Sequence, residues 1–299
     1  MRKDDQMVAT VLKDVSLIPY NSFRLDSKAS LMAFPYDNDS LRELIDTYGD
    51  KKRIIVIGKG TNVIFSKKLY SEDYLFINLK LMDNIQMEKP NRIKVQGGAK
   101  LSDLVWFAIE NNIKDLEFLE DIPGTVGGGI IMNAGTHKNT IGKFIKVVTY
   151  FDLYKNEIIT REVREGDFTK RKSYWSENET IVLSALIESE PGDYVESLRI
   201  VMKEKEKRFM KQPRNFPSAG SVFVRPEKDL KEHVVWELID EVGLRGYAIN
   251  GCAFSEKHPG FIVNTGGATY EDIMELVKIA KERVLEKFDV ELQMEWKII

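Results

Sequence analysis

Residues 122–139 read IPGTVGGGIIMNAGTHKN, and this short stretch holds five of the 20 glycines of a 299-residue chain. Three glycines in a row beside an apolar run cost backbone entropy on folding, unless a close approach of the main chain requires them. Successive backbone amides that turn inward form a concave site for an anion. The segment therefore predicts a place where main-chain amides, rather than charged side chains, meet a ligand.

A second small-residue segment, GKGTN, occupies residues 58–62 and also follows an apolar run. Alone, it is better explained by an ordinary hairpin turn. It does not complete the dinucleotide pattern GxGxxG, because Val63 stands where the third glycine would be needed. Together, the two segments predict a nucleotide-type cofactor whose diphosphate is held by backbone.

Composition excludes several classes of protein. The 44 basic and 47 acidic residues give a formal net charge of −3, which argues against general attraction to nucleic acid or to an anionic membrane surface. The single cysteine, Cys252, excludes an intramolecular disulfide. The chain has no signal-peptide pattern and no run of about 18 apolar residues, so we expect a cytoplasmic protein that binds neither nucleic acid nor membrane.

The pattern of apolar residues indicates an α+β protein. A capped helix, a buried strand at 53–57 and a tight turn are expected after Asp37. The short apolar runs YLFINL, RIKVQG, KVVTYFDLY and TIVLSALIE predict strands, and KLSDLVWFAIENN predicts a helix between them. We interpret the region up to about Met210 as strand-rich.

A domain boundary is expected near Lys211, where KQPRNFP follows a charged helix at 198–210. Beyond it we expect a strand at SVFV, a helix near HVVWELIDEVG and a closing helix. Thr269 and Asp272 have the spacing of a capping box at the start of that closing helix. Its apolar residues fall on one face, and they are Ile273, Leu276, Val277, Ala280 and Val284.

Seven segments occur in an order that resembles one enzyme family. They are GKGTN, LEFLEDIPGTVGGGIIMNAG, RKS, RFMKQP, PSAGSVFVRP, SEKHPGFIVNTGGAT and ELQMEW, and they extend from about Ser22 to Glu295. Each is modest alone, but the ordered set resembles the UDP-N-acetylenolpyruvoylglucosamine reductases, also called UDP-N-acetylmuramate dehydrogenases or the MurB family. The length and the lack of an insertion between residues 186 and 212 resemble the shorter, type II form.

The resemblance implies a two-subdomain FAD-binding fold of the PCMH type, as in vanillyl-alcohol oxidase, followed by an α+β substrate-binding domain. It divides the chain into residues 1–70, 71–210 and 211–299, with residues 288–299 completing the first part. It further implies non-covalently bound FAD, NADPH as co-substrate, and a small-molecule partner, the enolpyruvyl ether of a UDP-sugar. We expect a monomeric flavoprotein oxidoreductase of peptidoglycan synthesis, acting on a CH–CH bond.

The resemblance also assigns site residues. Those that match the cofactor segments are Gly58, Gly60, Thr61, Asn62, Pro123, Gly124, Gly128, Gly129, Asn133 and Gly135. Those that match or neighbour the substrate segments are Lys211, Arg225 and His258, and no metal ligand is implied. The sequence departs from the family pattern at FRLDSKAS, where a GGPA-type segment is usual, and at Lys170 and Gly260, where the family usually has tyrosine and asparagine.

Reduction of the enolpyruvyl double bond builds negative charge on the adjoining carboxylate, which must be stabilised before carbon is protonated. Ser221 matches the family serine that delivers the proton, Arg171 the arginine that pairs with the carboxylate, and Glu295 the glutamate beside the intermediate. Taken singly, each is more simply a turn or surface residue. Two alternatives stay open: a sugar or alcohol oxidase on the same FAD scaffold, and a catalytically silent nucleotide-binding module.

The remaining histidines and the cysteine carry weaker predictions. His137 occupies a place that suggests the covalent flavin anchor of related oxidases, although the resemblance implies FAD that is bound without a covalent link. The three histidines are too scattered for a zinc site. Cys252 is interpreted as a buried apolar residue.

Overall fold

The computed structural model describes residues 9–136, 139–228 and 231–299, and the chain divides into two compact units. Unit 1 holds residues 9–15, 29–58 and 70–206. Unit 2 holds the described parts of 16–28, 59–69 and 207–299. The boundary passes between Gly58 and Lys59, so the GKGTN segment contributes residues to both units. The division into three domains stays a prediction.

Unit 1 begins with a small sheet of order β1-β2-β6-β3, in which β2 and β3 both run parallel to β6. Its helix α1 starts where Asp37 accepts a hydrogen bond from the Ser40 amide, which confirms the predicted capped helix. A strand is present where a buried strand was predicted, but of β3 only Ile55 is buried, and Val56 is exposed, so the predicted burial is wrong. The bounds are β1 Ala9–Ser16, β2 Lys28–Pro35, α1 Asn38–Tyr48, β3 Arg53–Val56, β5 Leu69–Tyr70 and β6 Tyr74–Ile77.

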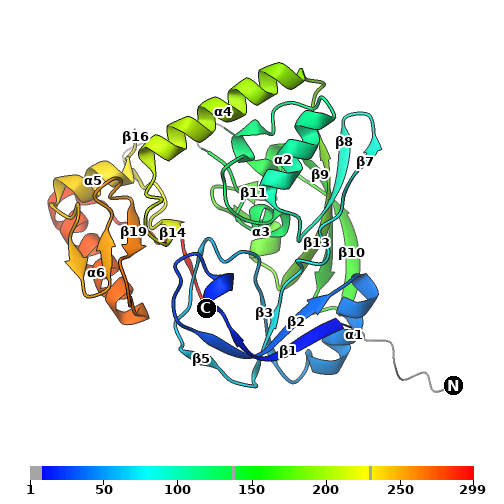
Figure 1. Ribbon diagram of the computed structural model, residues 1–299, viewed down its shortest axis with the longest axis horizontal. Helices are drawn as coiled ribbons and strands as arrows, with labels where there is room; N and C mark the ends of the chain where they lie inside the picture. The colour runs from blue at the N-terminus through cyan, green and yellow to red at the C-terminus, as the bar shows by residue number, and fades with distance from the viewer. Residues whose placement is uncertain (1–8, 137–138, 229–230) are drawn as a thin grey trace. The chain divides into compact units, whose positions relative to one another are not determined.

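The second sheet of unit 1 is antiparallel, with the order β10-β9-β13-β8-β7, and α2 and α3 lie on one of its faces (Figure 1). All the strands and the helix expected in this region are present. The bounds are β7 Ile85–Lys89, β8 Arg92–Gln96, α2 Leu101–Glu110, η2 Glu117–Leu119, α3 Val126–Ile131, η3 Ile141–Lys143, β9 Ile145–Asp152, β10 Glu157–Glu162, β11 Phe168–Thr169, β12 Lys172–Ser173, η4 Tyr174–Ser176 and β13 Thr180–Glu188.

Strand β13 is buried on both faces, which explains its nearly continuous apolar sequence TIVLSALIE. Ile181 and Leu183 join the core formed with α1 and the small parallel sheet. Val182 and Ala185 face the other way and pack with α2 and α3. The second core therefore fixes α3, which carries the three consecutive glycines, against the sheet.

Helix α4, Tyr194–Lys211, crosses from unit 1 into unit 2, and the expected charged helix at 198–210 is confirmed within it. Unit 2 is built on a sheet of order β14-β19-β18-β17, with α6 packed against β17 and β18. Its other elements are η1 Ile18–Tyr20, β4 Val63–Ile64, β14 Ser218–Ser221, β15 Glu227–Lys228, β16 Lys231–Glu232, α5 Val235–Glu241, β17 Ala248–Ile249, β18 Cys252–Phe254, β19 Phe261–Asn264, α6 Tyr270–Phe288 and β20 Lys297–Ile298.

The closing helix α6 agrees with its prediction in detail. Thr269 and Asp272 form the capping box, and the five apolar residues expected on one face are buried. The strand predicted at SVFV is wrong in position, because β14 ends at Ser221, where the prediction began. Ser218 and Ser221 pair with Val263 and Phe261 of β19, and Gly220 between them has a φ of 81°, which apolar patterning does not report. No helix in the described ranges combines the length and apolar character needed to cross a membrane.

Candidate active site

The glycine-rich segment of unit 1 is a short loop followed by a helix, rather than a loop throughout. Thr125 is the N-cap of α3 and accepts a hydrogen bond from the Gly128 amide at 3.3 Å, so the three glycines form the first turn. A Cβ on Gly127 would lie 3.0 Å from the Gly97 carbonyl oxygen, and one on Gly129 would lie 3.1 Å from Leu101. Two of the three glycines thus serve close packing, and the exposed Gly128 is the one open to a ligand.

The first glycine segment meets the second within unit 1. A Cβ on Gly58 would lie only 2.6 Å from Thr125 Oγ1, so the Thr125 side chain packs on this part of the backbone because residue 58 is a glycine. The Asn78 side chain donates to the carbonyl oxygens of Ile57 and Gly58, at 2.8 and 3.0 Å, and fixes this approach. Thr125 and Asn78 are absent from the sequence predictions, although Thr125 has the residue type expected of an N-cap.

Arg171 lies in the two-residue turn of the β11–β12 hairpin, with a positive φ of 59° that is uncommon for a residue with a side chain. Its guanidinium donates to the Gly135 carbonyl oxygen at 3.2 Å. The buried side-chain amide of Asn133 donates through Nδ2 to the Thr169 carbonyl oxygen at 2.9 Å, and its Oδ1 accepts from the backbone amide of Gly142 at 3.1 Å. The end of the glycine segment and the hairpin of Arg171 are therefore held together.

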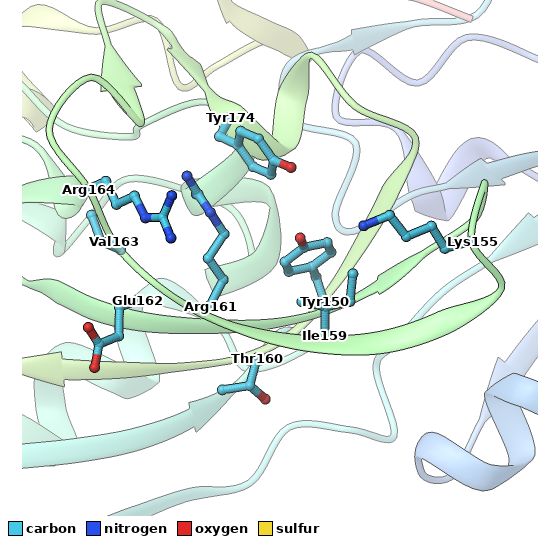
Figure 2. Close-up of a pocket in the computed structure, with 9 residues that line it drawn as sticks. All are labelled: Tyr150, Lys155, Ile159, Thr160, Arg161, Glu162, Val163, Arg164 and Tyr174. Atoms are coloured by element: carbon cyan, nitrogen blue, oxygen red, sulfur yellow. The ribbon is translucent and has the colours of Figure 1, made fainter.

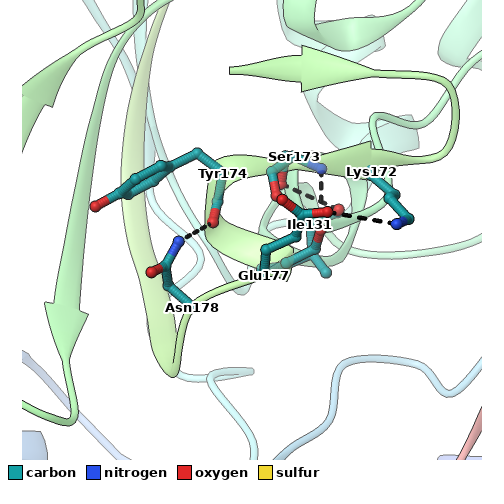
Figure 3. A network of polar contacts seen from close by, with 7 residues as sticks. Ile131, Lys172, Ser173, Tyr174, Glu177 and Asn178 are labelled. Atoms are coloured by element: carbon teal, nitrogen blue, oxygen red, sulfur yellow. Dashed lines mark hydrogen bonds and ion pairs between the residues drawn. The ribbon is translucent and has the colours of Figure 1, made fainter. Parts of the chain in front are cut away.

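The residues after Arg171 form a second set of anchors (Figure 3). Ser173 and Ser176 cap η4 reciprocally, and the Ser173 hydroxyl donates to the carbonyl oxygen of Ile131 at the end of α3, at 3.1 Å. On the outer side, Lys172 pairs with Glu177 at 3.4 Å. The hairpin is thus attached to α3 on both sides of its turn, which limits where the Arg171 side chain can move.

In unit 2, Ser221 is the last residue of β14 and its Cα partner in β19 is Phe261. The Ser221 hydroxyl donates to the Phe223 carbonyl oxygen at 3.3 Å, near the upper limit for such a bond. Gly220, just before it, has a φ of 81°, a conformation that β-carbon residues rarely adopt. The backbone conformation of Gly220 therefore sets the direction in which the Ser221 side chain leaves the strand.

Glu295 lies on the opposite side of the same segment. Its amide donates to the Val222 carbonyl oxygen at 2.8 Å, and its own carbonyl oxygen accepts from the Asn62 side chain at 3.1 Å. Asn62 in turn accepts from the Lys297 amide at 3.0 Å. Unit 2 therefore brings one residue of a predicted cofactor segment, Asn62, to the backbone that carries two predicted catalytic residues, Ser221 and Glu295.

The other half of the GKGTN segment is packed tightly in unit 2. A Cβ on Gly60 would lie 1.9 Å from the Tyr20 carbonyl oxygen, and its φ is 59°. The Ser22 amide donates to the Gly60 carbonyl oxygen at 3.1 Å, while its hydroxyl donates to that of Ser218 at 2.7 Å. The segment FRLDSKAS, which departs from the family pattern, thus follows a residue that links the first glycine loop to β14.

The three predicted substrate residues lie in unit 2. Lys211 is the exposed last residue of α4, and Arg225 pairs with Glu232 at 3.3 Å. His258 is partly buried, and burial lowers the pKa of its imidazole, with further lowering by the positive charges of Arg245, Lys211 and Arg225. His137 lies outside the described residues.

Two further features lie apart from these residues. Cys252 is fully buried, and burial raises the pKa of its thiol to about 12, so it stays protonated, in agreement with the predicted apolar role. A hollow of about 520 Å³ lies beside β9 and β10 in unit 1 and contains none of the predicted site residues (Figure 2). Its Arg161 is already held by Asp167 at 2.7 and 2.8 Å and lies over the Tyr174 ring.

Two family models match parts of this chain. Residues 29–157 match a family model described as FAD binding domain, and residues 212–299 match the model for the UDP-N-acetylenolpyruvoylglucosamine reductase C-terminal domain. The UDP-N-acetylenolpyruvoylglucosamine reductase of Caldanaerobacter subterraneus subsp. tengcongensis is 36% identical over 281 residues, covering 94% of this chain and 90% of the relative. That of Lactobacillus acidophilus is 34% identical over 290 residues, covering 97% and 95%.

A solved structure supports the same relationship. The crystal structure of UDP-N-acetylenolpyruvylglucosamine reductase from Thermus caldophilus matches with a TM-score of 0.79 and 25% identity, covering 97% of this chain and 99% of that one. Sequence identity and fold together show that this chain belongs to the UDP-N-acetylenolpyruvoylglucosamine reductase family.

Proposed function

We propose that this protein binds FAD and uses NADPH to reduce UDP-N-acetylglucosamine-enolpyruvate to UDP-N-acetylmuramate, a precursor of peptidoglycan. The observation that carries the proposal is the grouping of Asn62, Ser221 and Glu295 in a chain that also matches the FAD-binding model. The proposal places the reaction in the cytoplasm and treats the protein as a monomer.

The glycine segments fit a cofactor held through its diphosphate. Gly58 and Thr125 are in contact, and the exposed Gly128 offers backbone beside them without a side chain. Backbone amides suit a diphosphate in a chain whose net charge is −3, because they bind an anion without added lysines. When bound, FAD supplies the hydride that is added to the double bond. The packed positions Gly127 and Gly129 keep α3 close enough to the sheet for this contact.

We assign charge stabilisation to Arg171. Its planar guanidinium can form two parallel hydrogen bonds to a carboxylate, which a lysine cannot do. The hairpin, Asn133 and the Gly135 carbonyl oxygen fix its backbone and one of its nitrogens before any substrate binds. Donors that are already in position commonly contribute about 3 kcal/mol to stabilising a developing charge, because no reorganisation is needed.

We assign proton delivery to Ser221 and stabilisation of the intermediate to Glu295. The Ser221 hydroxyl makes only a 3.3 Å hydrogen bond, so little is lost when it turns to donate to carbon. General acid catalysis contributes roughly 10²–10⁴-fold. Glu295 is attached to the same backbone through Val222, which keeps its spacing from Ser221 constant.

We further propose that Lys211 and Arg225 bind the anionic UDP portion. Lys211 carries an exposed ammonium at the end of α4, where it can pair with a phosphate at little desolvation cost. Arg225 is paired with Glu232 on the surface, an exchangeable interaction worth little in water.

A spectroscopic experiment tests the whole proposal. The purified holoprotein is expected to show an oxidised-flavin spectrum that NADPH bleaches without oxygen, and that UDP-N-acetylglucosamine-enolpyruvate then restores. Recolouring by oxygen alone would indicate an oxidase, and no bleaching would indicate a silent binding module. NADH in place of NADPH tests the nucleotide preference.

Variants separate the two half-reactions. Ser221→Ala is expected to bleach with NADPH as the unaltered protein does, but to recolour with the enolpyruvyl substrate at least about 100-fold more slowly. Ser218→Ala, on the same strand, is the matched control, because its backbone rather than its hydroxyl makes the contact with Ser22. Normal recolouring by the Ser221 variant would remove the serine from its role.

A further inference from the structure

The hairpin that carries Arg171 is too short to maintain its own conformation. Strands β11 and β12 form two residue pairs, Phe168 with Ser173 and Thr169 with Lys172. A two-stranded hairpin on its own is at best marginally stable in water. Arg171 is the second of the two turn residues and has a φ of 59°, where a turn of this kind normally has glycine. The conformation of Arg171 must therefore be maintained by contacts from outside the turn.

The chain enters this hairpin at Asp167 and leaves it at Tyr174. The Tyr174 amide donates to the Asp167 carbonyl oxygen at 2.7 Å and closes the base of the hairpin. The Asp167 carboxylate is only 7% exposed, and its Oδ2 accepts from the Arg164 amide at 2.7 Å. The base is therefore well defined on the side where the chain enters.

The side chain of Arg161, on β10, contacts both ends of the base. Its Nη1 and Nη2 donate to Oδ2 and Oδ1 of Asp167 at 2.7 and 2.8 Å, the two parallel bonds of a strong ion pair. Its guanidinium carbon lies 4.1 Å from the centre of the Tyr174 ring, and Figure 2 shows the group beside that ring. One guanidinium thus contacts the residue before the hairpin and the residue after it.

Arg161 is itself fixed in the antiparallel sheet. Its Cα pairs with that of Val148 in β9, and its side chain is 18% exposed. A partly buried pair of this geometry is screened by salt less than a surface pair and is more rigid. Although Arg161 borders the hollow beside β9 and β10, Asp167 and Tyr174 already take two of its nitrogens and contact its planar group. The guanidinium is therefore better suited to hold the hairpin than to bind a ligand.

This contact differs in kind from the other anchors of the hairpin. Asn133 bonds to the strand at Thr169, and Ser173 bonds to α3 through Ile131. Arg161 instead joins the base of the hairpin to the edge strand of the sheet. A shift of the base would reach the turn, because only two residue pairs separate them.

We propose that Arg161, through its pair with Asp167, is a positioning residue that directs the Arg171 guanidinium towards the substrate carboxylate. The inference rests on the proposed function and deepens it, because it concerns the role assigned there to Arg171. Arg161 acts through the hairpin and is given no contact with the substrate. Since a misplacement of about 1 Å can slow a reaction roughly 100-fold, a modest shift of the base is enough to be measured.

The test is a double-mutant cycle of Arg161→Lys and Arg171→Lys in the FAD-loaded protein. Arg161→Lys keeps the positive charge but loses the two parallel bonds and the planar contact with Tyr174. We expect bleaching by NADPH to stay within about twofold of the unaltered rate, and recolouring by saturating enolpyruvyl substrate to slow at least about tenfold. With lysine already at residue 171, the same change should slow recolouring less than about twofold, because the group that it positions is gone.

Further variants separate positioning from general stability. Asp167→Asn removes the charge of the other partner and should show the same pattern, so either variant alone completes the cycle. Asp167→Glu keeps a carboxylate that can accept two bonds, and it should recover part of the lost recolouring rate. Glu188→Gln is the matched control: it breaks the Arg92–Glu188 ion pair, which joins β8 to β13 in the same unit, and should leave both half-reactions unchanged. Melting temperatures are measured for all the variants.

The inference is overturned if Arg161→Lys and Asp167→Asn recolour at the normal rate, or if they slow bleaching as much as recolouring. It is also overturned if the change at Arg161 slows recolouring by the same factor with arginine and with lysine at residue 171. When Arg171→Lys slows recolouring but the other two variants do not, this inference fails and the proposed function stands. Normal recolouring by Arg171→Lys itself would remove both the proposed role of Arg171 and the inference built on it.

Discussion

Asn133 offers a sharp test of how unit 1 holds the proposed carboxylate-binding arginine. Its buried side chain makes two hydrogen bonds, to the Thr169 carbonyl oxygen at 2.9 Å and from the Gly142 amide at 3.1 Å. Removing the side chain leaves both backbone groups without this partner. Because an unpaired buried polar group costs about 1–3 kcal/mol and both bonds are only partly buried, Asn133→Gly is expected to lower the free energy of unfolding by about 1–3 kcal/mol.

A second variant separates backbone conformation from hydrogen bonding. Asn133 has a φ of 43°, which glycine adopts freely and alanine does not. Asn133→Ala is therefore expected to be less stable than Asn133→Gly by about 1 kcal/mol. Asn178→Ala is the matched control, because this exposed amide makes one bond, to the Tyr174 carbonyl oxygen at 2.6 Å, and its loss should cost less than about 1 kcal/mol.

The assay combines thermal unfolding with the two half-reactions of the flavin. Since Thr169 is one residue before the turn that carries Arg171, we expect Asn133→Gly to slow recolouring by the enolpyruvyl substrate while bleaching by NADPH is less affected. The reasoning is refuted if Asn133→Gly has the same melting temperature as the unaltered protein. It is also refuted if the variant is destabilised as expected but its flavin is reoxidised by the enolpyruvyl substrate at the normal rate.

Three other changes have definite expected outcomes. Arg171→Lys keeps the positive charge but loses the guanidinium that can form two parallel hydrogen bonds to a carboxylate. Turnover should therefore fall by roughly 10²–10³-fold with little change in melting temperature. A smaller loss of turnover would contradict the assigned role. Burial, with a hydrogen bond to Tyr174, raises the pKa of Tyr150 to about 12, so its contribution to stability is complete below pH ~10 and is lost as the pH rises towards 12. That loss amounts to about 2–3 kcal/mol and should be missing in Tyr150→Phe, as alkaline unfolding titrations of both proteins would show. Gly60→Ala would place a Cβ 1.9 Å from the Tyr20 carbonyl oxygen at a residue whose φ is 59°. The variant should therefore have a lower melting temperature and a lower FAD occupancy. An unchanged flavin-to-protein absorbance ratio would argue against a role of this loop in cofactor binding.

Local rules explain which elements could be predicted. Helix α6 begins at a capping box formed by neighbouring residues, and its buried face follows from a regular spacing of apolar side chains. The strands of the antiparallel sheet are likewise visible as short apolar runs, because β9 and β13 are covered on both sides. In each case the signal lies within a few residues along the chain.

Predictions were less successful where backbone approaches backbone. Apolar patterning put a strand at SVFV, whereas β14 occupies the small residues Ser218–Ser221, which fit against β19. The glycines at 127–129 were expected to leave main-chain amides open to a ligand, yet they lie in the first turns of α3, where Gly127 and Gly129 pack against Gly97 and Leu101. A glycine in the sequence indicates that space is needed at that position, but it does not indicate which neighbouring residue will occupy the space.

The family, the α+β class, the capped helices and the residue types of the candidate site could all be predicted from the amino-acid sequence. The contact of Gly58 with Thr125, the hydrogen bond by which Asn133 holds the hairpin of Arg171, and the space that Gly260 leaves for the His258 ring are visible only in the folded chain. The difference lies in how far apart along the chain the interacting residues are. Caps and periodicity arise from interactions between near neighbours, whereas these contacts depend on excluded volume and hydrogen bonds that exist only after distant or folded-back segments have packed together.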